Sequence, residues 1–254
     1  MTSPILVTGG TGTLGRLVVA RLRDAGRDVR VLSRKSHPDA NGLSYATGDL
    51  AKNEGIGPAV EGVSAIVHCA SDKKGDADAT RNLVRAAEQA DVPHLVYISI
   101  VGVDDVTFGY FKSKLESEQV IKESGVPWTM LRVTQFYDFI LNGAQKAKKL
   151  PLVPVPAGFK VQPIDPEEVA VKLAELAVGK PAGRVPDLVG PEATDAADMI
   201  RAYLKAIHKG APVLPVWMPG IGKIRSGGLL PKGAEGEYAT ARVTWEEFLA
   251  AKLA

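Results

Sequence analysis

The chain has 254 residues, of which 45% are hydrophobic and 24% are charged. This composition is ordinary for a globular protein, and it excludes a disordered chain, a collagen-like fibre and a coiled-coil rod. With 31 basic and 29 acidic residues the net charge is only +2, so we expect no nucleic-acid partner. The length fits one large α/β domain, or one domain with a small appended lobe.

The single cysteine and the short apolar runs indicate the compartment in which the protein works. Cys69 has no partner for an internal disulfide, and the four histidines lack the spacing of a metal site. No apolar run approaches the roughly 20 residues needed to span a bilayer. The N-terminus lacks the pattern of a signal peptide. We therefore expect a cytoplasmic protein with no metal and no membrane partner.

The first 35 residues predict a βαβ unit. Residues 5–7 form a short, unbroken apolar run, which is typical of a strand buried on both faces. A glycine-rich turn follows, and then apolar residues recur at helical spacing until Gly26 ends the helix. A second strand is expected over residues 29–32.

Strands and helices continue to alternate along the chain. We expect strands over residues 43–47, 65–70, 95–99 and 128–132, and helices over residues 55–60, 76–90 and 110–123. This alternation implies a parallel sheet with helices on both faces. The sequence therefore predicts an α/β fold with a Rossmann-type doubly wound parallel sheet over residues 1–150.

The pattern changes after residue 150, where several prolines interrupt the chain. Helices are still expected over residues 166–178, where Asp165 and Pro166 form a typical helix start, and over residues 194–208. A strand is expected near residues 185–189, a loop-rich region over 211–234, and a short helix at the end. We predict that residues 151–254 form a small C-terminal substrate lobe, integrated with the core into a single unit.

The glycine-rich turn is the strongest indication of a ligand. Glycine is required where the turn is tight, where the backbone approaches a pyrophosphate and where the helix packs closely on the sheet. The helix N-terminus then offers unpaired N–H groups and a partial positive charge to phosphates. The expected cofactor ligands here are Gly9, Gly10, Thr11, Gly12, Thr13, Leu14, Gly15 and Arg16. The alternative is a purely structural tight turn.

The end of the second strand indicates which dinucleotide binds. An NAD-specific site usually has an acidic residue there, which binds the ribose hydroxyls. This chain has Ser33 and Arg34 instead, and Arg16 lies just after the last glycine. An arginine can pair with a 2′-phosphate, so we expect NADP(H) as the cofactor, unless these are simply solvated charges.

Two other strand ends supply further candidate cofactor residues. Asp49 and Leu50 follow the third strand and could bracket the adenine, although a plain helix cap is almost as plausible. Cys69 and Ala70 end the fourth strand and Ser71 follows it, and all three are assigned to the same edge of the sheet. The alternative for Cys69 is an inert core thiol.

Tyr110 and Lys114 are candidate catalytic residues. They lie four residues apart on a predicted helix, so their side chains share a face. An ammonium stabilises a nearby phenolate, and such a tyrosine can give a proton to a carbonyl oxygen as hydride arrives at the carbon. The lysine can also hold the nicotinamide ribose. The alternative is a surface pair beside an apolar stripe.

Two more positions complete the candidate site. Ser99, at the end of the fifth strand, could donate a hydrogen bond to the substrate oxygen, or be only a strand-end residue. Phe136 and Tyr137 follow the sixth strand and could line a hydrophobic substrate pocket. Core packing of these aromatic residues is at least as plausible.

Taken together, these motifs resemble an atypical short-chain dehydrogenase/reductase of the NmrA-like, NAD(P)H-binding group. The resemblance runs over almost the whole length and is carried by residues 8–16, 48–50, 97–99, 110–114, 125–132 and 163–165. It implies an NADP-linked Rossmann core with a small C-terminal substrate lobe. Members of this group include ketone, quinone and sugar-nucleotide-like reductases, and also sensors that bind the dinucleotide without turnover. The chain departs from the group where Ile100 and Val101 follow Ser99 in place of further hydroxyls.

The function expected from the sequence is NADPH-dependent reduction of a small carbonyl or quinone substrate. Tyr110 would act as the general acid, Lys114 as its electrostatic partner, and Ser99 as a hydrogen-bond donor. The alternative is an NADP(H)-binding regulatory protein that senses redox state without turnover. The sequence gives no indication of the oligomeric state.

Overall fold

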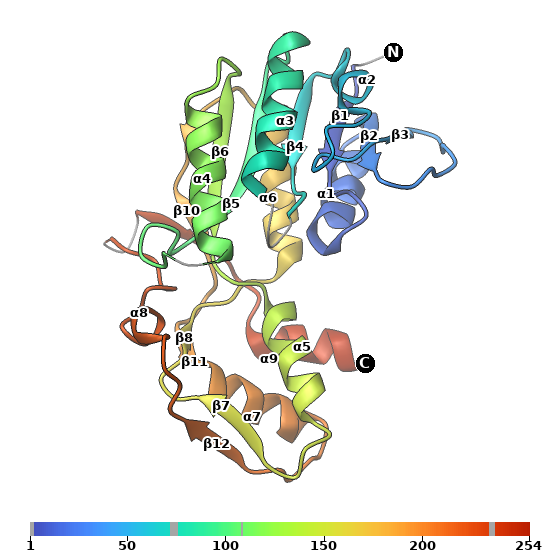
Figure 1. Ribbon diagram of the computed structural model, residues 1–254. Helices are drawn as coiled ribbons and strands as arrows, with labels where there is room; N and C mark the ends of the chain where they lie inside the picture. Colours follow the sequence, from blue (N-terminus) through green and yellow to red (C-terminus); the bar gives the residue numbers. More distant parts are fainter. Residues whose placement is uncertain (1–2, 72–75, 108, 234–236) are drawn as a thin grey trace.

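The computed structural model describes residues 3–71, 76–107, 109–233 and 237–254. Figure 1 shows two parts, a large sheet with helices on its faces and a smaller lobe next to one end of that sheet. No helix in the described ranges is long and apolar enough to cross a membrane.

The large sheet has nine strands within the described residues. They are β1 (Ile5–Thr8), β2 (Val29–Ser33), β3 (Leu43–Thr47), β4 (Ala65–His68), β5 (Leu95–Ile100), β6 (Trp128–Val133), β9 (Gly183–Arg184), β10 (Asp187–Val189) and β13 (Tyr238–Thr240). Every pairing between these strands is parallel. The order β3-β2-β1-β4-β5-β6 is that of the doubly wound dinucleotide-binding fold, which confirms the predicted fold class.

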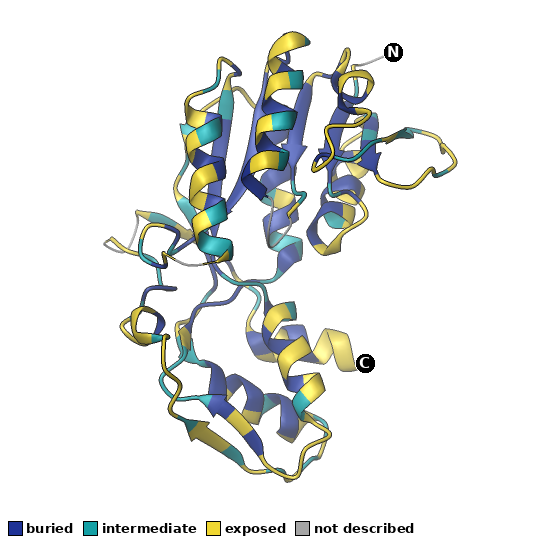
Figure 2. Cartoon of the chain, in the orientation of Figure 1, coloured by how far each residue is buried: buried dark blue, intermediate teal, exposed yellow. Residues whose placement is uncertain are grey.

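Helices bury both faces of this sheet, which explains why its central strands are continuous apolar runs. The helices α1 (Thr13–Asp24) and α6 (Pro166–Val178) cover one face. The helices α2 (Ile56–Val60), α3 (Asp76–Gln89) and α4 (Tyr110–Lys122) cover the other. Figure 2 shows the resulting buried layer along the middle of the sheet.

The lobe has its own hydrophobic core. Its elements are α5 (Tyr137–Ala147), β7 (Val153–Pro156), β8 (Lys160–Val161), β11 (Thr194–Asp195), α7 (Ala196–Ala206), β12 (Val213–Val216), α8 (Gly222–Arg225) and α9 (Trp245–Leu253). The strands β7 and β12 pair in parallel, and β8 and β11 pair antiparallel. The loops that join α5 to β7 and α7 to β12 lie at the end of the lobe farthest from the large sheet (Figure 1).

The chain passes repeatedly between the two parts. Helix α5 packs in the lobe although it precedes residue 150, and α6 returns to pack on the large sheet beside α1. The domain boundary expected near residue 150 stays a prediction.

Two details at the element ends differ from the sequence-based expectations. Helix α7 begins at Ala196 and not at Thr194, because the carboxylate of Asp195 accepts the N–H of Ala197 at 2.9 Å and caps the helix. The strands of two to four residues in the lobe were not predicted, since such short elements have no measurable periodicity.

Candidate active site

The glycines that follow β1 have no room for side chains. Gly9 has a φ of +69°, and a Cβ atom on it would lie 2.7 Å from the backbone nitrogen of Ala70. A Cβ on Gly15 would lie 2.1 Å from the carbonyl oxygen of Gly9, and one on Gly10 would lie 2.8 Å from a methyl group of Val31. The turn is therefore bare backbone at these positions, as the close approach of a pyrophosphate requires.

The start of α1 is suited to bind an anion. Gly12 caps the helix without a side-chain hydrogen bond, and the first turn contains no acidic residue. The first N–H groups of an α-helix have no intrahelical partner, and they carry a partial positive charge. The turn and this helix end together fit the diphosphate of a dinucleotide. The individual ligands assigned from Gly9 to Arg16 stay predictions.

Two arginines stand where an NADP site would need them. Arg16 and Arg34 are exposed, and neither forms an ion pair with any residue in the described part of the chain. Ser33, at the end of β2, is buried, and its hydroxyl accepts the N–H of Lys35 at 3.2 Å and lies 3.2 Å from Nε2 of His37. These charges and donors fit a 2′-phosphate, while their direct contact with it stays a prediction.

The segment after β3 forms a local cap. The carboxylate of Asp49 accepts the backbone N–H of Ala51 at 2.9 Å, and Leu50 is buried in the core on the α2 and α3 side of the sheet. This geometry favours the capping alternative for Asp49. The adenine contact of these two residues stays a prediction.

The end of β4 lies against the glycine turn. Cys69 donates its N–H to the carbonyl of Thr8 at 3.2 Å, and Ala70 donates its N–H to the Thr8 hydroxyl at 3.3 Å. Burial raises the pKa of Cys69 to about 12, so its thiol is neutral and inert near pH 7. Burial, together with the charge of Lys114, lowers the pKa of His68 to about 3, and the neutral ring bonds the Thr8 hydroxyl at 2.7 Å. The segment thus positions backbone and contributes no reactive group.

The polar centre of the site joins the starts of α3 and α4. The hydroxyl of Tyr110 lies 3.1 Å from that of Ser71, and the Ser71 hydroxyl is 3.1 Å from the carboxylate of Asp76. Nζ of Lys114 lies 3.2 Å from the same carboxylate and 3.3 Å from the carbonyl of Ile98, to which it donates. Both partners of this ion pair are almost fully buried, since their side chains are 2% and 4% exposed.

The surroundings keep Lys114 charged. Its Nζ lies 4.8 Å from the ring centre of Tyr97 and 5.6 Å from that of Tyr110. Burial opposes the charge, but Tyr97, Tyr110 and Asp76 outweigh it and raise the pKa of Lys114 above its ordinary value. The face shared by Tyr110 and Lys114 on one helix is therefore confirmed, and a fixed positive charge lies beneath the phenol. Their catalytic roles stay predictions.

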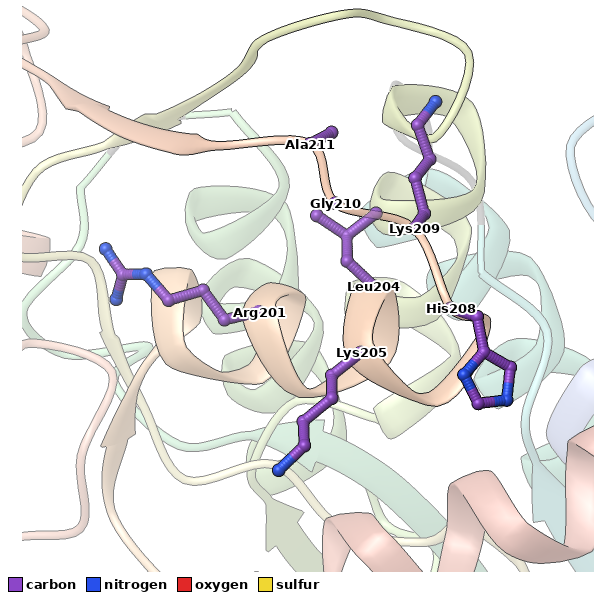
Figure 3. A pocket seen from close by; sticks show the side chains of 7 residues that line it. All are labelled: Arg201, Leu204, Lys205, His208, Lys209, Gly210 and Ala211. Carbon is purple, nitrogen blue, oxygen red and sulfur yellow. The ribbon is translucent and has the colours of Figure 1, made fainter.

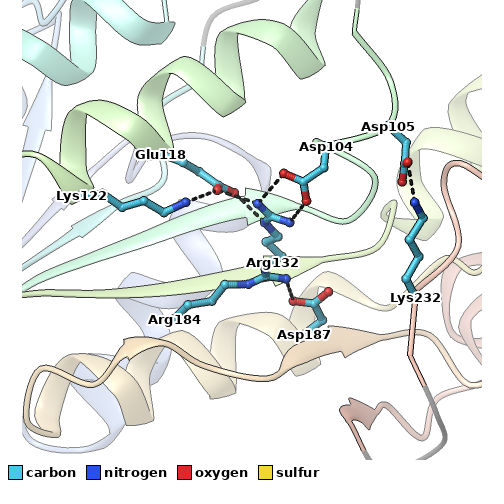
Figure 4. Close-up of polar contacts among 8 residues, drawn as sticks. All are labelled: Asp104, Asp105, Glu118, Lys122, Arg132, Arg184, Asp187 and Lys232. Atoms are coloured by element: carbon cyan, nitrogen blue, oxygen red, sulfur yellow. Dashed lines mark hydrogen bonds and ion pairs between the residues drawn. The ribbon is translucent and has the colours of Figure 1, made fainter.

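Ser99 belongs to a different cluster. It is fully buried on β5, next to the ion pair that Glu118 forms with Arg132 at 2.7 Å. Burial opposes the ionised form of Glu118, but the hydrogen bonds from Arg132 hold its pKa below the ordinary value. The buried Ser99 hydroxyl has no hydrogen-bond partner among the described residues. Figure 4 shows that Arg132 also binds Asp104, in the loop that leads to α4. The catalytic role of Ser99 stays a prediction, and this packing does not favour it.

The two predicted substrate residues have different environments. Tyr137 is 2% exposed, its hydroxyl donates to the carbonyl of Val243 at 2.9 Å, and its ring packs on Trp245 and Phe248. This supports core packing for Tyr137. Phe136 is partly buried, directly before α5. Contact of either residue with a substrate stays a prediction.

Asp76 is the main residue of the site that the sequence reasoning missed. It begins the helix that follows β4, and helix starts commonly carry aspartate for capping alone. The signal was its place after the fourth strand of a dinucleotide fold, where side chains reach the same sheet edge as Tyr110. Within the described ranges, no three histidine, cysteine or acidic side chains cluster so that they could hold a metal ion.

Comparison with known proteins agrees with a dinucleotide site at the glycine turn. A family model described as NAD(P)H-binding matches residues 9–177. The chain is 33% identical to (4-alkanoyl-5-oxo-2,5-dihydrofuran-3-yl)methyl phosphate reductase of Streptomyces griseus, over 76% of this chain and 70% of the relative. It is 30% identical to NAD(P)H azoreductase of Xenophilus azovorans, over 82% of this chain and 75% of the relative.

Among solved structures, the chain is similar to the NADPH-dependent quinone oxidoreductase of Escherichia coli in complex with NADPH. The two superimpose with a TM-score of 0.83 over 98% of this chain and 100% of the other, at 20% sequence identity. That similarity shows the fold. The match of the family model to two thirds of the chain shows more, namely that this protein belongs to the NAD(P)H-binding family.

Proposed function

We propose that this protein reduces a quinone or a small carbonyl compound with NADPH. The observation that carries the proposal is the polar centre of Tyr110, Ser71, Asp76 and Lys114, which lies at the sheet edge where the glycine turn would hold a dinucleotide. The bound nicotinamide supplies a hydride, and the protein must supply the proton and the geometry.

Tyr110 is the proton donor in this proposal. Its hydroxyl would give a proton to the substrate oxygen as that oxygen gains negative charge. The charged Lys114, 5.6 Å from the ring centre, stabilises the phenolate that remains. The lysine itself is held by Asp76 and by the carbonyl of Ile98.

Ser71 links this donor to the carboxylate. It has one hydroxyl proton, and it lies 3.1 Å both from the Tyr110 oxygen and from Asp76. While Tyr110 is neutral, its single proton points to the substrate oxygen, and the Ser71 hydroxyl donates to Asp76. Once Tyr110 has lost its proton, the Ser71 hydroxyl turns and donates to the phenolate, which lowers the energy of the charged state.

The relatives support the reductase assignment and the class of substrate. Two of them are named as reductases, and the similar solved structure is named as a quinone oxidoreductase with NADPH bound. The exposed, unpaired Arg16 and Arg34 support NADPH over NADH. The names of these three proteins all point to a small-molecule substrate.

The test is a turnover screen. Purified protein is incubated with NADPH and, separately, with NADH, against a panel of quinones and small ketones, and cofactor oxidation is followed at 340 nm. Turnover of at least one panel member, faster with NADPH, is the expected result. Tight NADPH binding without turnover of any member would instead favour the alternative, a sensor of redox state.

A further inference from the structure

The lobe has a strongly uneven distribution of charge. Ten of the 31 basic residues lie in two segments, residues 139–164 and 199–233, which contain no aspartate or glutamate at all. These ten are Lys146, Lys148, Lys149, Lys160, Arg201, Lys205, Lys209, Lys223, Arg225 and Lys232. The rest of the chain carries all 29 acidic residues and the other 21 basic ones, so the small net charge conceals two purely basic segments.

The fold brings part of this charge to one place. The N–H of Val153 donates to the carbonyl of Pro212 at 2.9 Å, and Val153 is paired with Val213 in the β7–β12 ladder. The loop at residues 148–152 leads into β7 and the loop at residues 207–212 leads into β12, so the two loops lie side by side. They are about 60 residues apart in the sequence. Both lie at the end of the lobe farthest from the large sheet (Figure 1). We call these two loops the lobe tip.

The basic residues at the lobe tip have no acidic partners among the residues that the structure describes. Lys148, Lys149 and His208 are exposed, and Lys209 is partly exposed. None of them forms an ion pair with a residue that the structure describes. Figure 3 shows His208 and Lys209 just after the end of α7. Both line a pocket of about 340 Å³.

The same tip also exposes apolar side chains. Leu150 is 44% exposed and Leu152 is 42% exposed, on either side of an exposed proline. Leu214, on the neighbouring strand, is 46% exposed. Val153 and Val155 of β7 point into the lobe core, so the alternate positions on the strand point outward. The three leucines therefore place apolar surface beside the lysines at this end of the lobe.

We infer that the lobe tip docks on an anionic lipid surface. Lysines near a negatively charged bilayer are attracted to its headgroups, and leucines at the same level insert below them. A nucleic acid would satisfy the charge but would leave the leucines in water, and His208 is the single ring in the two loops on which a base could stack. Docking there would leave the carboxyl edge of the large sheet uncovered, because that edge lies at the opposite end of the lobe (Figure 1).

This inference differs from the sequence-based expectation of no membrane partner. That expectation rested on the lack of a spanning segment and on the small net charge. Neither reveals a surface built from two segments that meet only in the folded lobe. The inference does not rest on the proposed function, although a membrane-bound reductase would have direct access to lipid-soluble quinones.

The experiment is co-sedimentation with lipid vesicles, without cofactor or substrate. Wild-type protein is mixed with vesicles of phosphatidylcholine alone and of phosphatidylcholine with 30% phosphatidylglycerol, at 50 mM and 300 mM salt. We expect binding only to the anionic vesicles, and weaker binding at the higher salt. Equal binding to both kinds of vesicle, or no binding at 50 mM salt, overturns the inference.

Matched variants separate the tip from general charge. Each lysine near an anionic surface contributes about fivefold to binding, so Lys148→Glu with Lys149→Glu should weaken it at least tenfold. The control, Arg85→Glu with Lys180→Glu, makes the same charge change at exposed sites outside the lobe and should bind nearly as wild type. An equal loss in both double variants overturns the inference.

A second pair of variants tests the lipid against other polyanions. Leu150→Ala with Leu152→Ala keeps the charge, and it should weaken vesicle binding about fivefold if the leucines insert. Val171→Ala with Val178→Ala, at exposed positions on α6, is the control. Unchanged binding of the leucine variant shows a simple polyanion site and overturns the membrane assignment. All four positions changed at the tip are exposed, so the fold should survive, and thermal melting checks this.

Discussion

Replacing Asp76 with asparagine should destabilise the protein by about 3 kcal/mol. Asp76 and Lys114 form an ion pair whose side chains are 4% and 2% exposed. Removing one partner of a buried pair typically costs about 3–5 kcal/mol, because the other charge stays buried. The asparagine amide oxygen still accepts one hydrogen bond from the ammonium, which places the expected loss near the lower limit.

This loss is large enough to measure by thermal unfolding. In a chain of this size 1 kcal/mol changes Tm by roughly 2–4 °C, so Asp76→Asn should lower Tm by about 6–12 °C at pH 7. The double variant Asp76→Asn with Lys114→Met leaves no unpaired charge, and it should recover part of the loss relative to Lys114→Met alone. A loss below about 1 kcal/mol, with no coupling between the two sites, would refute the account of this pair.

The pH dependence of the same pair has a defined sign. The folded state raises the pKa of Lys114 above its ordinary value of 10.5, because Tyr97, Tyr110 and Asp76 together outweigh burial. The stabilising contribution is therefore fully present below pH 10.5 and is lost as the pH rises towards the folded-state value. The stability difference between wild type and Asp76→Asn should be constant from pH 7 up to pH 10.5 and shrink only above that.

Three other variants test separate parts of the site. Arg34→Ala should weaken NADPH binding by about 1.5–3 kcal/mol and leave NADH nearly unchanged, as measured by titration of both cofactors; equal affinity of the wild type for the two would sink the assignment. Gly15→Ala places a Cβ 2.1 Å from the Gly9 carbonyl oxygen, so it should abolish NADPH binding and cost about 1–3 kcal/mol of stability. The control is Gly143→Ala on α5, where a Cβ would have nothing within 4 Å, and it should not destabilise the protein. Tyr137→Phe removes one hydrogen bond and should cost about 1 kcal/mol with KM unchanged, and a raised KM would argue instead for the substrate pocket.

The sequence predicted the features that depend on neighbouring residues. The glycines after β1 occur at fixed spacing within one turn, and the alternation of strands and helices predicted a parallel sheet with helices on both faces. Asp165 before Pro166 marked the start of α6, and the structure confirms that helix from Pro166 to Val178.

Features that depend on distant segments were beyond sequence reasoning. Asp76 and Lys114 are 38 positions apart, and only the packing of α3 against α4 brings them together. From the sequence alone, Phe136 and Tyr137 fit a substrate pocket and a packed core equally well. Val243, whose carbonyl accepts the hydrogen bond of the Tyr137 hydroxyl, lies 106 positions away in the chain. The basic lobe tip likewise depends on the pairing of β7 with β12.

In the proposed NADPH-dependent reduction, Tyr110 gives the proton to the substrate. The most direct measurement is kcat of Tyr110→Phe with a ketone, beside the Kd of the same variant for NADPH. A quinone serves as a parallel substrate, because its reduced oxyanion is delocalised and needs less help from an acid. We expect a drop in kcat of roughly 10²–10⁴-fold with the ketone, a smaller drop with the quinone and an unchanged Kd. Full activity of Tyr110→Phe with both substrates would contradict this role of Tyr110.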